Sequence, residues 1–182
     1  MNEAKKQPMG LVIVYTGNGK GKTTASLGMC IRAAGYKKKV KIIQFIKGSW
    51  HYGELDGIKL LSEFVDLEQM GKGFVGIIDD KEDISVHIAA AGKTLARSRE
   101  VMLSGKYDIL ILDELNVALK LNLIKLDDVL ELIRSKPESL HLVITGRDAH
   151  EKVIELADLV TEMKEIKHPF QKGILAQQGV DF

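Results

Sequence analysis

Short apolar runs alternate with longer segments of helical periodicity along this chain. Two of the runs, 109–112 and 142–145, are continuously apolar, without the polar alternation of a strand that has one face in water. Such runs are typical of strands buried on both faces, as in a parallel sheet covered by helices. The expected strands span residues 11–15, 40–46, 64–70, 109–112 and 142–145, with 64–70 the weakest.

Four intervening segments have the spacing of helices. The first opens directly from a glycine-rich turn and ends at Gly35, a residue type that tolerates the left-handed conformation common after a helix. The expected helices span residues 22–34, 84–103, 126–133 and 149–157. Strand and helix therefore alternate, which predicts an α/β fold with a mostly parallel sheet and helices on both faces. Ligands bind such folds outside the carboxyl ends of the strands.

Composition narrows the class of protein. The chain has 182 residues, 26 Lys plus Arg against 25 Asp plus Glu, and one cysteine. That length and only three prolines favour a single domain over 1–182, with 1–9 as a flexible N-terminal extension. A net charge of +1 argues against a nucleic-acid binder, and one cysteine favours a reducing, cytoplasmic location. Because no apolar run is long enough to span a bilayer, we expect no membrane partner.

A glycine-rich loop joins the first expected strand to the first helix. Three glycines in five residues let backbone N–H groups converge on an anion, and the helix start adds the positive end of its dipole. The loop reads Thr16, Gly17, Asn18, Gly19, Lys20, Gly21, Lys22, Thr23 and Thr24. Lys22 suits phosphate oxygens and the Thr23 hydroxyl suits Mg²⁺. The phosphate-loop consensus has glycine where this chain has Thr16, and a plain turn with surface lysines is the weaker alternative.

A pair of acidic residues follows the fourth expected strand. Residues 109–112 are apolar, and the strand ends in Asp113 and Glu114. In phosphate-loop proteins this strand end places a carboxylate near the Mg²⁺ held by the loop threonine. Taken alone, an aspartate at the start of a helix would explain the pattern equally well. Together with the loop, it predicts a P-loop, RecA-like fold.

Further segments, in this order along the chain, resemble one enzyme family. They lie at the ends of the expected strands and in the tail, and span residues 44–54, 70–74, 113–116, 145–150, 155–158, 167–173 and 176–180. With 16–24, they are similar to the phosphate-loop type of ATP:corrinoid adenosyltransferase, over roughly 10–182. The resemblance implies transfer of the 5′-deoxyadenosyl group of ATP to Co(I) of a reduced corrinoid, with tripolyphosphate as the leaving group and the nucleotide reversed in the loop.

The resemblance also implies roles for particular residues. Lys22, Thr23 and Glu114 would be catalytic, and Thr23, Asp113 and Glu114 would hold Mg²⁺ or Mn²⁺. Residues 16–24 would bind ATP together with Lys47 and Arg147. The corrinoid side would be formed by Trp50, Glu54 and Phe74.

The same resemblance implies partners, and this chain departs from the family pattern in two places. It implies a reduced flavin or flavoprotein as electron donor and a homodimer. The family often has tryptophan where this chain has Gly76, and some members have a longer N-terminal arm over the corrinoid. Trp50 could also be a partly buried core residue, and Arg147 could simply cap a loop.

Two other functions share much of this pattern. A small phosphate-loop kinase or NTPase would attack the γ-phosphate and would need a base, for which Glu54 or Asp148 is available. A nucleotide-binding regulatory module is the second alternative, and a RecA-like nucleic-acid motor is disfavoured by the near-neutral charge.

Overall fold

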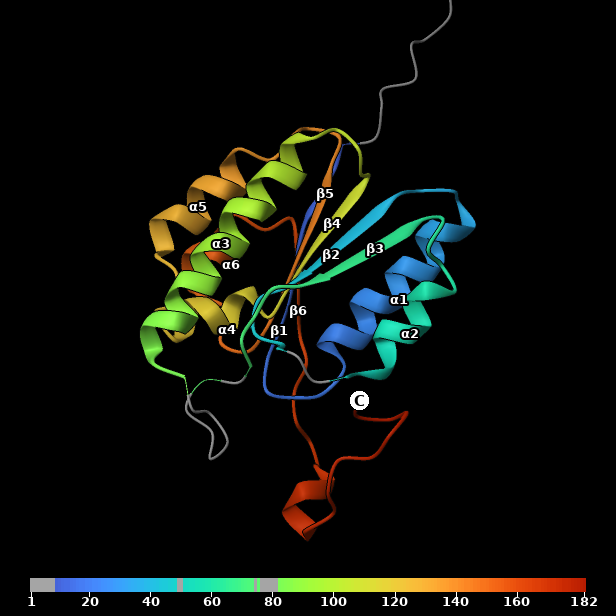
Figure 1. Ribbon diagram of the computed structural model, residues 1–182, viewed down its shortest axis with the longest axis vertical. Helices are drawn as coiled ribbons and strands as arrows, with labels where there is room; N and C mark the ends of the chain where they lie inside the picture. The colour runs from blue at the N-terminus through green and yellow to red at the C-terminus, as the bar shows by residue number, and fades with distance from the viewer. Residues whose placement is uncertain (1–8, 49–50, 74, 76–81) are drawn as a thin grey trace, which may run out of the picture.

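Six parallel strands form one sheet in the computed structural model, which describes residues 9–48, 51–73, 75 and 82–182 (Figure 1). The strands are β1 (Val12–Thr16), β2 (Val40–Gln44), β3 (Val65–Gln69), β4 (Ile109–Asp113), β5 (His141–Thr145) and β6 (Leu159–Glu162). Their order across the sheet is β3-β2-β4-β5-β1-β6, and every neighbouring pair is parallel. The predicted α/β fold with a parallel sheet is confirmed.

Helices cover both faces of this sheet (Figure 1). They are α1 (Lys22–Gly35), α2 (Gly53–Lys59), α3 (Ile84–Leu103), α4 (Leu115–Lys120), α5 (Leu126–Arg134) and α6 (Glu151–Glu155), with a 3₁₀ turn, η1, at Pro169–Lys172. On the face of α1 and α2, Ile111 and Val143 pack with Cys30. On the other face, Leu112 and Ile144 join the larger core under α3 to α6. Successive strand residues are thus buried on opposite faces, which explains the continuously apolar runs.

The elements that the sequence pattern missed are short. β6 has four residues, all exposed, and pairs only with β1, so it has no buried face to produce an apolar period. α2 contains two glycines, and α4 has only six residues, directly after Glu114. The predicted last helix, 149–157, is shorter than expected and begins at Glu151. In the described part of the chain no helix has the length and hydropathy needed to cross a lipid bilayer.

The carboxyl ends of the strands gather the segments that the sequence singled out. The phosphate loop follows β1, the acidic pair ends β4, and Thr145 ends β5 between them in the sheet order. The chain after β6 runs to η1 and then returns, so that its last residues lie beside the phosphate loop (Figure 1). This edge of the sheet is therefore where a functional site is to be sought.

Candidate active site

The phosphate loop is shaped by left-handed glycines and by the chain that follows β6. Gly21 precedes α1 with a φ of 107°, and no side chain caps the free N–H groups of that helix. A Cβ on Gly17 (φ 94°) would lie 2.5 Å from the Met163 carbonyl oxygen, so this position requires glycine. The Lys22 ammonium folds back over the loop and donates to the carbonyl oxygens of Gly17 and Gly19, at 2.8 and 2.7 Å. The loop thus presents helix N–H groups and a cation to one anion-sized space.

Thr16, the departure from the glycine consensus, anchors the loop to a neighbouring segment. It is the last residue of β1 and is buried, and its hydroxyl accepts a hydrogen bond from the Ala149 N–H at 3.1 Å. A glycine here could not make this link. The threonine therefore ties the phosphate loop to the segment after β5, which contains Arg147.

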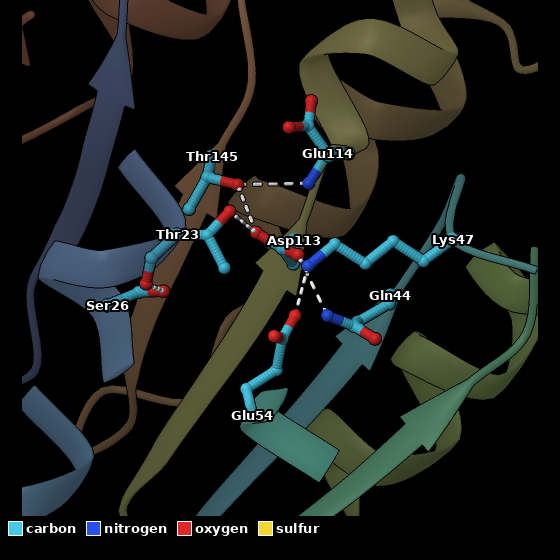
Figure 2. A network of polar contacts seen from close by, with 8 residues as sticks. All are labelled: Thr23, Ser26, Gln44, Lys47, Glu54, Asp113, Glu114 and Thr145. Carbon is cyan, nitrogen blue, oxygen red and sulfur yellow. Dashed lines mark hydrogen bonds and ion pairs between the residues drawn. The ribbon is translucent and has the colours of Figure 1, made fainter. Parts of the chain in front are cut away.

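Asp113 is the centre of a buried polar network that joins the carboxyl ends of β2, β4 and β5 to the start of α1 (Figure 2). One carboxylate oxygen accepts from the hydroxyls of Thr23 and Thr145, each at 2.8 Å. The other oxygen accepts from the side-chain amide of Gln44 at 3.1 Å. Asp113 is fully buried, so these donors replace the water that would otherwise bind its side chain. The network fixes the loop threonine relative to β2, β4 and β5.

Glu114 is held in a strained conformation beside this network. Its φ of 62° is left-handed, which is costly for a residue other than glycine, and its N–H donates to the Thr145 hydroxyl at 3.0 Å. Within the described residues nothing hydrogen-bonds its carboxylate. Burial is the main reason why the pKa of Glu114 is raised to about 7; the Asp113 charge adds to it, and nearby cations, Lys22 foremost, oppose it. A half-buried carboxylate that lines the cleft beside a phosphate loop is suited to a cation.

This pKa predicts a pH-dependent stability. Folded Glu114 holds its proton up to about pH 7, whereas an unfolded glutamate releases it near pH 4.3. The free energy of unfolding of the metal-free protein should therefore fall as pH rises through this interval, by up to about 3 kcal/mol from this group. Glu114→Gln cannot ionise and should lack this contribution, so its stability advantage over wild type should grow between about pH 5 and pH 8. Urea unfolding in EDTA measures the free energy of unfolding of wild type and of Glu114→Gln. If the difference between the two proteins did not change with pH, the raised pKa of Glu114 would be contradicted.

A charged wall faces the loop from the segment after β2 and from α2. The Lys47 ammonium forms an ion pair with Glu54 (Figure 2). It also lies 4.6 Å from the centroid of the Tyr52 ring. Both partners of the ion pair are largely buried. Burial alone would raise the pKa of Glu54, but the hydrogen bond and charge of Lys47 outweigh it, and the pKa is lowered. Glu54 is therefore a carboxylate at neutral pH.

Loop and wall enclose a cleft of about 470 Å³, which the C-terminal residues complete. Its lining comprises Gly19, Lys20, Gly21, Lys22, Thr23, Thr24, Leu27, Lys47, Tyr52, Gly53, Glu54, Glu114, Arg147, Gly179, Val180, Asp181 and Phe182. Lys20 forms an ion pair with Asp181. Four cationic side chains and the helix N–H groups thus surround a space large enough for a polyphosphate, with Glu114 at one side.

The donor set fits Mg²⁺ or Mn²⁺. The Thr23 hydroxyl and the carboxylates of Asp113 and Glu114 are hard oxygen ligands, and Mg²⁺ in nucleotide sites takes one or two carboxylates together with phosphate oxygens and water. Among the residues with described positions, no group of three or more His, Cys, Asp and Glu side chains is arranged to hold a metal ion. A cation at this place would share its coordination with phosphate.

Known proteins similar in sequence to this chain are enzymes that act on ATP. The family model described as ATP:corrinoid adenosyltransferase BtuR/CobO/CobP matches residues 8–182. The chain belongs to this family. It is 41% identical over 173 residues to a corrinoid adenosyltransferase of Pseudomonas aeruginosa, covering 95% of this chain and 84% of that one. It is 36% identical to the corrinoid adenosyltransferase of Escherichia coli K12, covering 95% and 86%.

A solved structure supports the fold independently. A KaiC-like protein from Pyrococcus horikoshii superimposes with a TM-score of 0.50 at 14% sequence identity, over 88% of this chain and 76% of that one. At that identity the likeness concerns the fold alone. The adenosyltransferase chain thus has the P-loop, RecA-like architecture that its sequence predicts.

The cleft brings together most of the residues that the sequence predicts for it. Lys47, Glu54, Glu114 and Arg147 line it with the end of the phosphate loop, whereas residues 16–18 do not. Trp50, Phe74 and Gly76 lie outside the described residues, so their predicted corrinoid roles stay predictions.

Several side chains of this adenosyltransferase site were missed by sequence reasoning. Gln44 and Thr145 each end a strand, and this position could have identified them. Tyr52 lies within 47–54, the range that the resemblance predicts to line the nucleotide and corrinoid pocket, and it lines the cleft. Asp181 and Phe182 lie in a tail without periodicity, so no pattern placed them at the loop.

Proposed function

We propose that this protein transfers the 5′-deoxyadenosyl group of ATP to Co(I) of a reduced corrinoid and releases tripolyphosphate. The observation that carries the proposal is the match of residues 8–182 to the corrinoid adenosyltransferase family. The cleft supports it, because a phosphate loop, a cluster of cations and the carboxylate of Glu114 meet in one polyphosphate-sized space.

The loop residues act on the leaving group. Breaking the C5′–O bond leaves negative charge on the departing triphosphate, and stabilising that charge in place lowers the barrier. The N–H groups at the start of α1 are free of side-chain caps and can bind phosphate oxygens. Lys22 would exchange the carbonyl oxygens of Gly17 and Gly19 for phosphate oxygens, a short movement from its observed position. Arg147, which is exposed and lines the same cleft, would bind the same triphosphate.

Glu114, Thr23 and Asp113 would hold the divalent cation. Glu114 would bind it directly, since its carboxylate is not otherwise hydrogen-bonded, and Asp113 would fix the Thr23 hydroxyl beside it. When bound, Mg²⁺ or Mn²⁺ supplies positive charge to the triphosphate.

The two carboxylates named for the base of the kinase alternative are both held in ion pairs. A phosphoryl transfer would need a base to take a proton from its nucleophile. Glu54 is paired with Lys47 and has a lowered pKa, and Asp148 is paired with Lys120 at 2.5 Å. Attack by Co(I) needs no protein base, because the metal itself supplies the electron pair.

The corrinoid would lie beyond the Lys47–Glu54 wall, where Trp50, Glu54 and Phe74 are predicted to meet it. A hollow of about 570 Å³ lies between the end of β3 and α3, and it is lined by Lys72 and Gln69 among others. The Gln69 side-chain nitrogen is buried and has no hydrogen-bond partner among the residues that the structure describes. Such an amide suits the carbonyl oxygen of a corrinoid side chain.

A reduced flavin or flavoprotein would supply the electron that forms Co(I), the active form would be a homodimer, and the reaction would take place in the reducing cytoplasm. The fully buried Cys30 is consistent with a reducing compartment.

The products of the reaction test the proposal. With ATP, Mg²⁺ and an anaerobically reduced corrinoid, tripolyphosphate should appear in equal amounts with a cobalt–carbon bonded product. Anion-exchange chromatography separates tripolyphosphate from ADP, and the absorption spectrum of the corrinoid follows the second product. Without corrinoid we expect little ADP. Steady ADP formation in its absence would favour the NTPase alternative instead.

A further inference from the structure

We propose a second anion-binding site, for a small phosphorylated or carboxylated molecule with a flat apolar part, in a cavity at the amino ends of β4 and β5. The cavity has a volume of about 810 Å³, larger than the nucleotide cleft at the other end of these strands. It lies between the end of α1, the loop before β4 and the loop before β5. The inference does not rest on the proposed function.

Positive charge is concentrated in this cavity although the whole chain is nearly neutral. Three cationic side chains line it, those of Arg32, Lys38 and Lys106, against the single carboxylate of Asp108. Both oxygens of Asp108 are engaged, one by the Lys38 ammonium at 2.7 Å and the other by the Lys39 N–H at 2.8 Å. Within the described part of the chain, the side chains of Arg32 and Lys106 form no ion pair. Two unpaired cations at one concave surface attract an anion.

Neutral donors add to the cations. The Nδ1 atom of His141 accepts a hydrogen bond from the Leu11 N–H at 3.1 Å, so the neutral ring carries its proton on Nε2 and is a donor there. Burial, assisted by the Lys136 charge, lowers the pKa of His141, which favours this neutral form. The hydroxyl of Ser139 lies in the same lining. A phosphate or carboxylate group would thus find both charge and oriented donors.

The rest of the lining suits a flat apolar group. Ala33 and Ile109, which are both buried, contribute apolar lining to the cavity, and Met29 belongs to the same lining. Tyr36 also belongs to the lining, and because its side chain is 79% exposed, its ring is free to stack on a flat ligand. The volume lies within the range of small-molecule sites.

The probe is 1-naphthyl phosphate, followed by chemical-shift titration of the ¹⁵N-labelled protein. Amides of 105–109 and 139–141 should shift and saturate, and inorganic phosphate and 1-naphthol should each bind more weakly. Arg32→Ala with Lys106→Ala should weaken this binding at least tenfold. A control pair, Arg134→Ala with Lys125→Ala, removes the same charges from both ends of α5 and should leave it unchanged.

The nucleotide cleft serves as an internal reference in the same spectra. Shifts of the 17–23 amides report anion binding at the phosphate loop. The affinity of this loop for 1-naphthyl phosphate should be equal in wild type and in both double variants. Shifts confined to 17–23 would overturn the proposal, and so would equal weakening by the two double variants. Unaltered 17–23 shifts in the Arg32 and Lys106 variant also show that it is folded.

Discussion

Lys22→Ala should reduce adenosyl transfer at least about a hundredfold, the loss typical of removing one preorganised charge contact from a transition state. The Lys22 ammonium is buried against the loop and donates to two of its carbonyl oxygens, so it is already held at the anion space. The effect should fall mainly on kcat, because the leaving triphosphate carries more charge at the C5′–O bond in the transition state than in ATP. Tripolyphosphate release under saturating ATP measures it.

A second variant separates chemistry from packing. Lys22→Met keeps most of the aliphatic stem and removes the charge, so it should lose activity to a similar extent while the free energy of unfolding stays near that of wild type. Burial lowers the pKa of Lys22, which means that the folded protein gains little from this charge in the absence of nucleotide. Activity within about threefold of wild type in either variant would remove Lys22 from the proposed mechanism.

The sequence predicted those parts of the site whose chemistry lies in consecutive residues. The strand, glycine loop and helix around Lys22 are local, and local order alone places an anion site at the helix start. The buried strand before Asp113 is equally local. Parallel pairing then brings the two strand ends to one edge of the sheet, which explains why both predictions meet in the same cleft.

The remaining parts depend on contacts between distant segments. Thr145 reaches Asp113 only because β5 lies between β4 and β1, an order that no local pattern encodes. The strained backbone of Glu114 is held by that same threonine, and glutamate gives no sign of a left-handed φ. Asp181 meets Lys20 after the chain has passed through the exposed strand β6, which has no hydrophobic period. Such contacts require the tertiary structure.

Substitutions of Asp113 should separate stability from activity at the centre of the network. Asp113→Ala leaves the Thr23 and Thr145 hydroxyls and the Gln44 amide without their acceptor in a buried place. Since each unsatisfied buried group costs about 1–3 kcal/mol, we expect a loss of about 3–5 kcal/mol in the free energy of unfolding. Urea unfolding should detect this loss directly.

Asp113→Asn should behave differently because the amide can replace most of these bonds. Its oxygen can accept from both threonine hydroxyls, and its NH₂ group can donate to the Gln44 side-chain oxygen, which is buried without a partner, once the Gln44 amide turns over. That turn costs Gln44 its bond to Glu54, so a loss of about 1 kcal/mol is expected. Activity should still fall at least about a hundredfold, because the negative charge beside Thr23 and Glu114 is gone. Near-wild-type turnover in the folded asparagine variant would mean that Asp113 serves only to pack the network, and that Glu114 alone accounts for the cation.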